Sequence, residues 1–317
     1  MIHSEFEAPF VCLPIDALPV DVNWLLSMPV PVIAVGNGVS ANADVVVSGG
    51  AEIKRILANI ERAPTAALAL VQVLRITEHL PISAAMTVES LAYGTLQAGE
   101  MHQRWLASRG LSPCEIRGEG EPILITREGG CLRAEINRGS NRNALTVELR
   151  DALIELFELV LHDDSIEQLH ISGHGRCFGI GGDLREFGLN TDPALAHWIR
   201  SVHNPSRLLA SCADRVSVHL HGACLGSGIE LSAFAHWLSA DATTYFQLPE
   251  MRLGLIPGAG GCVSIARRIG RHRTAWMVLS GKKINAETAL EWGLIDEIIP
   301  ADSALAESAG MRAEESK

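Results

Sequence analysis

Two glutamates stand out in this sequence because each lies beside a glycine-rich turn and only twenty positions separate them. Glu230 follows the turn GACLGSG, and Glu250 precedes the stretch LIPGAGG. Two carboxyl groups that face one substrate can divide proton transfer, one serving as general base and the other as general acid. The pair therefore predicts acid–base catalysis. A structural alternative exists for Glu230, since the dipole of a helix also favours a glutamate in its first turn.

Two glycine-rich turns indicate a site for a negatively charged oxygen. The turn RCFGIGGDL at 176–184 follows an expected strand, and the turn GACLGSG at 222–228 leads into an expected helix. Glycines let backbone N–H groups approach an anion, and a helix N-terminus adds further donors. Taken alone, the first turn is better explained by tight packing, since glycine pairs are common in turns. Two of them in one core suggest an oxyanion hole with two donors.

Composition limits the function further. Of 317 residues, 47% are hydrophobic and 20% are charged, which is typical of a soluble globular protein. No apolar run is long enough to span a membrane, and the start MIHSEFEAPF does not resemble a signal peptide, so we expect a cytoplasmic protein. A net charge of −11 with scattered basic residues disfavours nucleic acid or membrane as partner. A negatively charged ligand would need a local basic pocket.

Neither metal nor covalent chemistry is favoured. The seven cysteines are widely spaced and form no C-x-x-C motif, which argues against a disulfide framework and a zinc cluster. His219 and His221 alternate along an expected strand and share one face, but a structural role is favoured over a metal pair because no further ligand lies nearby in sequence. Ser227 does not lie in a G-x-S-x-G motif, so it is not predicted to be a nucleophile.

The N-terminal part of the chain divides into two segments. Residues 1–50 have the pattern of a small α/β piece, with strands at 31–35 and 43–48 and a helix around 20–27. Residues 51–110 are helical in pattern, with breaks at Pro64 and Pro81. We expect the last helical stretch to bury one face, with these candidates: Leu91, Tyr93, Leu96 and Trp105.

The stretch 109–122 is polar and rich in glycine, which suits a boundary. Beyond it, PILITRE and CLRAEIN flank Gly129 and Gly130, a strong hairpin signal. A helix at about 144–162 follows, and then come strands at QLHIS, RVSVHLHG and HWLSA with the two glycine turns between them. Repeated units of strand, turn and helix predict an α/β core.

Over residues 119–300 the sequence resembles the crotonase superfamily, the enoyl-CoA hydratase and isomerase family. The resemblance is carried, in the family's order, by INRGSNRNALT, GRCFGIGGDL, VHLHGACLGSGIEL, FQLPEMRLGLIPGAGG and LSGKKINAETALEWGLIDEII. It implies a spiral of ββα units, an acyl-CoA thioester substrate, no cofactor or metal, and a homo-trimer or hexamer. It also implies that the backbone N–H groups of Gly182 and Ser227 form the oxyanion hole, although Ser227 replaces the family's usual glycine.

The resemblance assigns roles to individual residues. It implies that Glu230 activates water and that Glu250 exchanges the proton at C2 of a 2-enoyl thioester. Arg142 and Arg176 match basic positions near the CoA phosphates and adenine, although ordinary surface arginines would look the same. The other expected substrate contacts, which include backbone groups, are Asn143, Ala144, Gly181 and Asp183. Double-bond isomerisation and acyl-CoA hydrolysis are alternatives because the same oxyanion hole serves several reactions, and a non-catalytic thioester-binding subunit is another.

The chain departs from the family at its C-terminal end. Family members continue with helices that close the active site and build the trimer, whereas 301–317 is a short polar tail. The helical module 51–110 resembles those helices in the order of its segments. We therefore expect a rearranged layout in which this module covers the core; an unrelated helical domain is the alternative.

Overall fold

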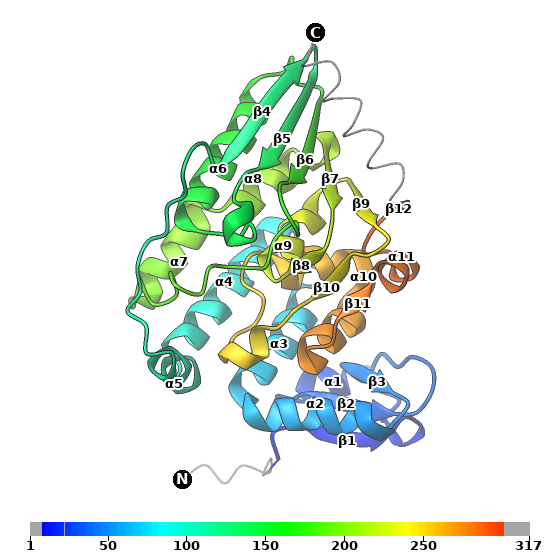
Figure 1. Ribbon diagram of the computed structural model, residues 1–317. Coiled ribbons are helices and arrows are strands. Elements are labelled where there is room, and N and C mark those ends of the chain that lie inside the picture. The colour runs from blue at the N-terminus through cyan, green and yellow to red at the C-terminus, as the bar shows by residue number, and fades with distance from the viewer. Residues whose placement is uncertain (1–7, 22, 301–317) are drawn as a thin grey trace.

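The computed structural model describes residues 8–21 and 23–300, and the segment 301–317 expected to be a polar tail lies outside them. The core is built on a six-stranded sheet with strand order β12-β9-β7-β6-β5-β4 (Figure 1). Its strands are β4 (Ile123–Glu128), β5 (Cys131–Ile136), β6 (Gln168–Gly173), β7 (Val216–Leu220), β9 (Trp237–Asp241) and β12 (Glu297–Ile299). Strands β4 and β5 form the predicted antiparallel hairpin, and the remaining pairs are parallel.

A second, three-stranded sheet runs beside the first and gives the core its spiral. It consists of β8 (Ala223–Leu225), β10 (Tyr245–Gln247) and β11 (Ile284–Asn285), and β8 pairs with β10 in parallel. Successive turns place one strand in each sheet and then a helix, as in β7, β8 and α9 (Ser227–Glu230). Bridges from Gly179 to Cys224 and from Leu145 to Gly182 extend the pattern to the earlier turns. The spiral of ββα units is thus confirmed.

Helices of the core cover the sheets. They are α6 (Val147–His162), α7 (Pro193–Val202), α8 (Pro205–Ser211), α10 (Gly261–Ser280) and α11 (Ala286–Trp292), with the short helices η2 (Gly139–Asn141) and η5 (Glu250–Leu253) at the site. Helix α9 is shorter than the helix expected at 229–235, because a separate 3-10 turn follows it at Ser232–Phe234. The described part of the chain has no helix that combines the length and hydrophobicity needed to cross a bilayer.

The N-terminal module is helical as predicted. It contains α2 (Gly50–Arg62), α3 (Pro64–Thr77), α4 (Ile82–Ala98) and α5 (Glu100–Ser108). Pro64 is the first residue of α3, and Pro81 precedes α4, which are positions where a missing N–H costs nothing. Leu96 is buried as expected, but the burial of Leu91 was predicted wrongly because this side chain is 52% exposed. Glu89 lies on the buried side of α4, and Leu91, two residues later, is rotated by about 200° around the helix axis, so Leu91 points away from that side.

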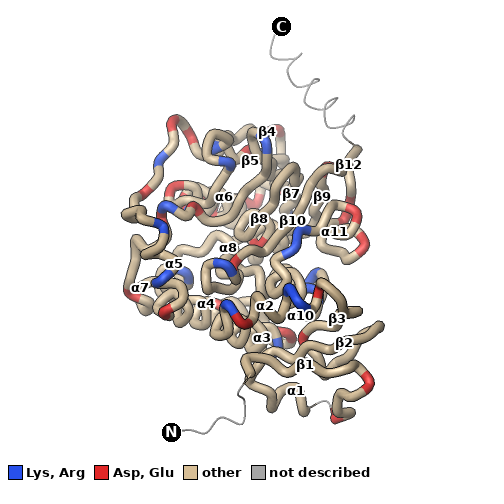
Figure 2. Tube along the Cα trace, turned by 60° about the horizontal axis from the view of Figure 1, so that its bottom comes forward, with Lys and Arg blue, Asp and Glu red and all other residues tan. Residues whose placement is uncertain are grey.

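The module packs directly on the core. Helices α2, α3 and α4 contact α10, and α4 also contacts α7 and α8. Figure 2 shows α3 and α4 passing beneath the core helices rather than standing apart from them. The expectation that 51–110 covers the core therefore agrees with this packing. That these helices take the place of the family's C-terminal helices stays a prediction.

The described residues before the helical module include a small parallel sheet with order β1-β2-β3. The predicted strands are β2 (Val32–Val35) and β3 (Val45–Val47), and the predicted helix is the short α1 (Trp24–Ser27). The sequence reasoning missed β1 (Val11–Pro14). Buried Asp44 accepts hydrogen bonds from Val32 N at 2.8 Å and from Arg75 Nε of α3 at 2.8 Å, which anchors this sheet to the helical module.

Candidate active site

Glu230 is held rigidly at the end of α9. Its side chain is buried, and its Oε2 atom accepts hydrogen bonds from Ala259 N at 2.8 Å and Gly261 N at 3.1 Å. The Ser264 hydroxyl donates to the Glu230 carbonyl oxygen at 2.6 Å, which fixes the main chain as well. With Oε2 engaged by two donors, the Oε1 atom remains to act on a ligand.

Glu250 is the first residue of η5, which begins shortly after strand β10 ends. It is buried, and within the described residues its Oε2 atom has no hydrogen-bond partner. A buried polar atom without a partner carries a free-energy cost, so such atoms are concentrated at functional positions. The unpartnered oxygen of Glu250 is therefore available for proton transfer.

Gly226 brings the two glutamates to a common point. A Cβ atom placed on Gly226 would lie 2.9 Å from Glu250 Oε1 and 3.7 Å from Glu230 Oε1. The backbone there has φ 49° and ψ −125°, a conformation essentially confined to glycine. The structure thus assembles the pair that the sequence singled out and directs one oxygen of each toward the same turn.

Burial raises the pKa of both carboxyl groups. The pKa of Glu230 rises to about 7, and backbone N–H donors oppose that rise. The pKa of Glu250 rises well above its ordinary value, and the neighbouring charge of Glu230 raises it further. Two such close groups titrate as a pair, and a pair that holds one proton can supply both the base and the acid of acid–base catalysis.

The two turns predicted to form the oxyanion hole lie side by side. A Cβ atom on Gly181 would be 3.8 Å from the Gly226 Cα atom, so the chain just before Gly182 approaches the chain just before Ser227. Neither Gly182 N–H nor Ser227 N–H donates to another group among the residues that the structure describes. Both remain available to a thioester oxygen, and their role stays a prediction.

The predicted CoA-binding residues lie on loops at this face. Arg142 and Arg176 are exposed, and Arg142 and Asn143 adopt positive φ values of 53° and 51°. The Asn143 side chain donates to His174 O and Cys177 O, and Ala144 is buried, which leaves backbone groups for any ligand contact. These assignments stay predictions.

Gly181 and Asp183 serve the loop itself. The Gly181 carbonyl accepts from Leu145 N at 2.9 Å, and the Asp183 carboxylate accepts from Asn141 and Arg185. Those donors lower the pKa of Asp183 to about 2. Because its oxygens are already engaged, we expect Asp183 to act on a ligand through the shape of the loop.

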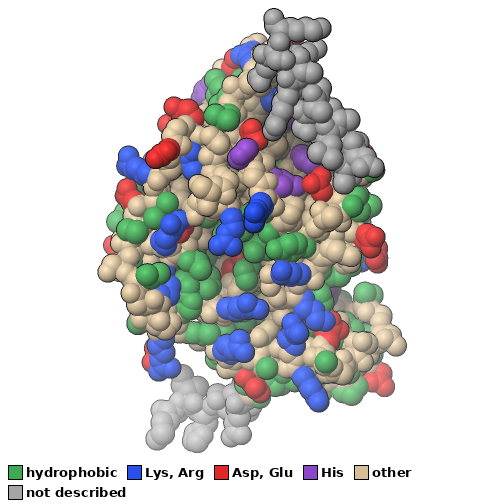
Figure 3. Space-filling view, viewed as in Figure 1, with side chains coloured by type: hydrophobic (Ala, Val, Ile, Leu, Met, Phe, Trp, Pro, Cys, Tyr) green, Lys and Arg blue, Asp and Glu red, His purple; other side chains and the backbone are tan. Residues whose placement is uncertain are grey.

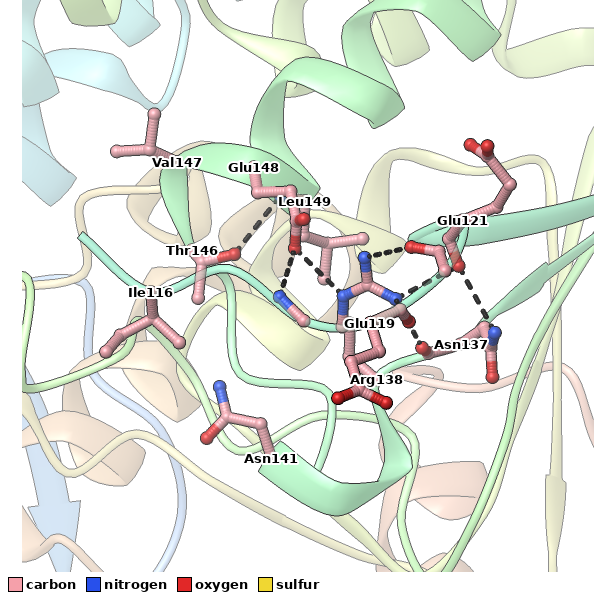
Figure 4. Close-up of polar contacts among 12 residues, drawn as sticks. Ile116, Glu119, Glu121, Asn137, Arg138, Asn141, Thr146, Val147, Glu148 and Leu149 are labelled. Carbon is pink, nitrogen blue, oxygen red and sulfur yellow. Dashed lines mark hydrogen bonds and ion pairs between the residues drawn. The ribbon is translucent and has the colours of Figure 1, made fainter.

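Arg138 fixes the loop that carries Arg142 and Asn143 (Figure 4). Its guanidinium forms an ion pair with Glu148 at 2.9 Å and donates to main-chain carbonyls of the segment 119–121. The polar stretch predicted as a boundary is thereby attached to the core at the loop before α6. Sequence reasoning did not identify Arg138, because apart from Glu148 its partners are main-chain carbonyls, which no residue type marks in the sequence.

A third buried glutamate was also missed. Glu89, from α4, accepts hydrogen bonds from Gly260 N at 2.8 Å and Cys262 N at 2.8 Å. Burial and the charge of Glu230 raise its pKa to about 8. The available signal was its position on the helix, since Glu89 shares the buried side with Ala85 and Met86.

Tyr93 is a second side chain of α4 that lies near the candidate site. A Cβ atom on Gly258 would lie only 2.3 Å from two carbons of the Tyr93 ring, so this ring packs directly on the loop beside Glu230. The Arg200 guanidinium of α7 covers the Tyr93 ring at 4.8 Å from its centroid. The packing of Tyr93 predicted from sequence is thus directed at the candidate site.

The histidine pair has other partners. His219 Nδ1 lies 3.0 Å from Ser239 Oγ, and its Nε2 lies 3.2 Å from Asp241 Oδ1. His221 Nε2 lies 3.1 Å from Gly175 O. No cluster of three or more metal-binding side chains occurs in the described ranges. These contacts support the structural role that the sequence favoured.

A basic hollow adjoins η5. Its volume is about 200 Å³, and its lining includes Arg55 and Arg62 of α2 together with Arg252, two residues after Glu250. The guanidinium groups of these three arginines form no hydrogen bond or ion pair within the described part of the chain. Figure 3 shows Lys and Arg side chains gathered over the lower half of this face. The strongly acidic chain thus has a local positive surface beside the glutamate pair.

Known proteins share this core. The sequence profile of the enoyl-CoA hydratase/isomerase family matches residues 126–316. The chain is 33% identical to the 2,3-dehydroadipyl-CoA hydratase of Escherichia coli K12 over 58% of its own length and 71% of the relative's. It is also 33% identical to the 1,2-epoxyphenylacetyl-CoA isomerase of the same strain, over 60% and 73%.

The trans-2-decenoyl-[acyl-carrier-protein] isomerase of Streptococcus mutans is 27% identical over 56% of this chain and 68% of that protein. Among solved structures, the enoyl-CoA hydratase of Thermoplasma volcanium superposes with a TM-score of 0.53 at 27% identity, covering 62% of this chain and 79% of that one. The enoyl-CoA hydratase of Bacillus anthracis gives 0.54 at 26% identity, covering 61% and 76%.

Proposed function

Because this chain belongs to the enoyl-CoA hydratase/isomerase family, we propose that it is a hydratase that adds water across the 2,3 double bond of an acyl-CoA thioester. The observation that carries the proposal is the convergence of Glu230 Oε1 and Glu250 Oε1 on Gly226. Hydration needs one group to take a proton from water and another to give a proton to carbon, and both groups are present. Water supplies every added atom, so the reaction requires no cofactor.

The proposed steps follow from the protonation states. Ionised Glu230 takes a proton from water while the water oxygen bonds to C3 of the substrate. The electrons of the double bond move toward the thioester oxygen, and protonated Glu250 then gives its proton to C2. Glu230 ends protonated and Glu250 ionised, and one proton passing between them restores the starting state. A close pair of buried carboxyl groups that shares one proton can supply both the base and the acid of these steps.

The negative charge that develops on the thioester oxygen would be received by Gly182 N–H and Ser227 N–H. Fixed donors in a site that excludes water stabilise such a charge more strongly than bulk water does. Loss of one such donor typically costs about 2.7–4 kcal/mol of transition-state stabilisation. Neither N–H group has an acceptor among the residues that the structure describes, which supports this assignment.

Isomerisation is the alternative within the family, and two of the relatives are named isomerases. Moving a double bond needs chiefly one carboxyl group, so the second buried glutamate favours hydration. The decisive experiment incubates the protein with crotonyl-CoA and with longer 2- and 3-enoyl-CoAs in D₂O. Formation of 3-hydroxyacyl-CoA supports the proposal. Deuterium exchange at C2 without water addition, or release of free CoA, points instead to an isomerase or a hydrolase.

The basic hollow supports an anionic carrier for the acyl group. We propose that Arg55, Arg62 and Arg252 attract the phosphates of CoA toward the face that bears Glu250. Replacing all three by alanine should raise KM for the acyl-CoA several-fold at low salt with little effect on kcat. The difference should shrink as ionic strength rises from about 0.01 M to 1 M, because salt screens exposed charges.

The matched control is Arg133→Ala, which removes an exposed arginine from β5. A KM that changes equally in both variants would contradict this role for the hollow.

A homo-trimer or hexamer is the proposed assembly, and light scattering of the purified chain measures it. Tight binding of acyl-CoA without turnover across the substrate panel would instead identify a non-catalytic thioester-binding subunit.

A further inference from the structure

Two carboxylates share one short stretch of backbone in an alternating pattern. Glu230 accepts from the N–H groups of Ala259 and Gly261, and Glu89 accepts from those of Gly260 and Cys262. We propose that Glu89 is a positioning residue: by holding the alternate N–H groups of 259–262, it fixes the loop that orients Glu230. The effect of Glu89 on catalysis rests on the proposed function, whereas its positioning of the loop is argued from these four hydrogen bonds alone.

The shared stretch is the beginning of helix α10. The first N–H groups of a helix have no partner within the helix and carry a partial positive charge. Here four successive N–H groups are satisfied by carboxylates alone, two by each glutamate. The next two donors, Val263 N and Ser264 N, bond to Gly260 O. Loss of Glu89 would therefore free two buried donors beside those that hold Glu230.

Close packing makes the arrangement sensitive to the identity of residue 89. A Cβ atom on Gly261 would lie 2.6 Å from Glu230 Cγ, and one on Gly260 would lie 2.4 Å from a Phe234 ring carbon. The loop is therefore enclosed by Glu230 and the core on one side. Helix α4 lies beside α10 and closes the other side (Figure 1). A movement of α4 or of its glutamate would be transmitted to Glu230 through main-chain atoms.

Several charged and titratable groups face Glu89 from the surrounding elements. They are Glu230 from α9, Glu250 from η5, Tyr93 from α4, Arg200 from α7, Arg207 from α8 and Cys262 from α10. The charge of Glu230 raises the pKa of Glu89, and electrostatic coupling acts equally in the reverse direction. The charge of Glu89 also raises the pKa of Glu250.

Glu89→Gln tests the positioning role. Glutamine can accept one of the two N–H groups but presents its NH₂ to the other, and it removes the charge. We expect kcat for enoyl-CoA hydration to fall about 10–100-fold with KM within about threefold, since an interaction of a few kcal/mol is disrupted. The alkaline limb of the pH–rate profile should shift to lower pH, because the charge of Glu89 raises the pKa of Glu250, the proposed acid, and glutamine removes that charge.

Two further variants separate positioning from general structural support. Glu89→Asp keeps the charge, so it should keep the wild-type position of the alkaline limb even if kcat falls. Glu100→Gln makes the same chemical change at an exposed position of the same module and should leave both quantities unchanged. A Glu89→Gln enzyme with unchanged kcat, or with lowered kcat but an unmoved alkaline limb, would overturn the proposal.

A measurement without substrate keeps this test independent of the proposed function. The chain labelled with [5-¹³C]glutamate is titrated by NMR, with the Glu230 signal assigned through Glu230→Gln. In the wild type we expect the Glu230 signal to show a later inflection as Glu89 ionises, and in Glu89→Gln we expect that inflection to be lost. Identical titrations would overturn the proposal even in an active enzyme.

If the wild type is inactive on all enoyl-CoAs, the proposed hydratase function is contradicted, but the positioning role of Glu89 is not. If Glu89→Gln does not fold, the wild-type titration still decides, because a single inflection for Glu230 would contradict the coupling.

Discussion

Glu230 and Glu250 direct their Oε1 atoms toward the same glycine, so that a methyl group at Gly226 would lie 3.7 Å from one and 2.9 Å from the other. The two residues come from different turns of the spiral, one from α9 and one from η5. The parallel pairing of β8 with β10 brings those turns together. The fold therefore places two buried carboxyl groups around Gly226, the residue before Ser227, whose N–H group has no acceptor among the described residues.

Gly226→Ala tests this convergence. The added methyl group would displace Glu250 Oε1 and would force alanine into a backbone conformation that costs about 1–3 kcal/mol. We expect kcat/KM to fall at least tenfold and the protein to lose stability, as measured by kinetics and urea unfolding. Gly270→Ala is the control, because Gly270 also has positive φ but an added Cβ meets nothing within 4 Å. Equal catalytic losses in both variants would contradict the convergence.

Ser227→Ala tests whether Ser227 acts through its backbone alone. The Ser227 hydroxyl is buried without a hydrogen-bond partner in the described structure, so its removal should leave stability equal or raise it by about 1 kcal/mol. The N–H group is retained, so we expect kcat within about threefold of wild type. Ser232→Ala provides the contrast, because the Ser232 hydroxyl donates to Gly228 O at 3.0 Å and its loss should destabilise the protein. A large loss of kcat in Ser227→Ala would assign a role to the hydroxyl.

Stability should fall as pH rises from 7 to 8. The folded state raises the pKa of Glu89 to about 8, of Glu230 to about 7 and of Glu250 well above its usual value. In this window the native state therefore holds more protons than the unfolded state, whose glutamates are ionised. The free energy of unfolding should decrease by up to about 1.4 kcal/mol per pH unit for each extra proton.

The window is chosen so that histidines do not interfere. Burial lowers the pKa of His102, His170, His221 and His272, which makes stability rise with pH only up to their unfolded pKa near 6.5. Urea unfolding at pH 7.0, 7.5 and 8.0 measures the slope, and Glu89→Gln should make it shallower. Stability that is constant or increases over this range would show that the three carboxyl groups do not titrate as described.

The hydrophobic pattern and turn chemistry predicted much of the fold. Pro64 and Pro81 marked helix boundaries correctly, and Gly129 with Gly130 marked the hairpin, because these residues restrict the local backbone. Strand β1 was missed because it is only four residues long, and its parallel pairing with β2 leaves no turn signal in the sequence. Leu91 was misplaced because helical periodicity alone does not say which side of α4 meets a neighbour.

The site was only partly accessible from sequence. Glu230 and Glu250 were identifiable because each lies beside a glycine turn, so local sequence carried the signal. Glu89 lies 171 positions from Gly260, the donor to its Oε1 atom, and no local pattern links the two. Arg138 likewise binds main-chain carbonyls that any sequence would supply. Contacts of this kind depend on how distant segments pack, which periodicity and motifs do not determine.

The most direct test of the proposed function is hydration of crotonyl-CoA by the wild type and by Glu230→Gln and Glu250→Gln. Both substitutions preserve size while removing proton transfer, and general acid–base catalysis typically contributes about 10²–10⁴-fold. We predict 3-hydroxybutyryl-CoA formation by the wild type and a loss of this order in kcat for each variant, with circular dichroism spectra that match the wild type. Wild-type hydration that persists unchanged in both variants would contradict the two-glutamate mechanism.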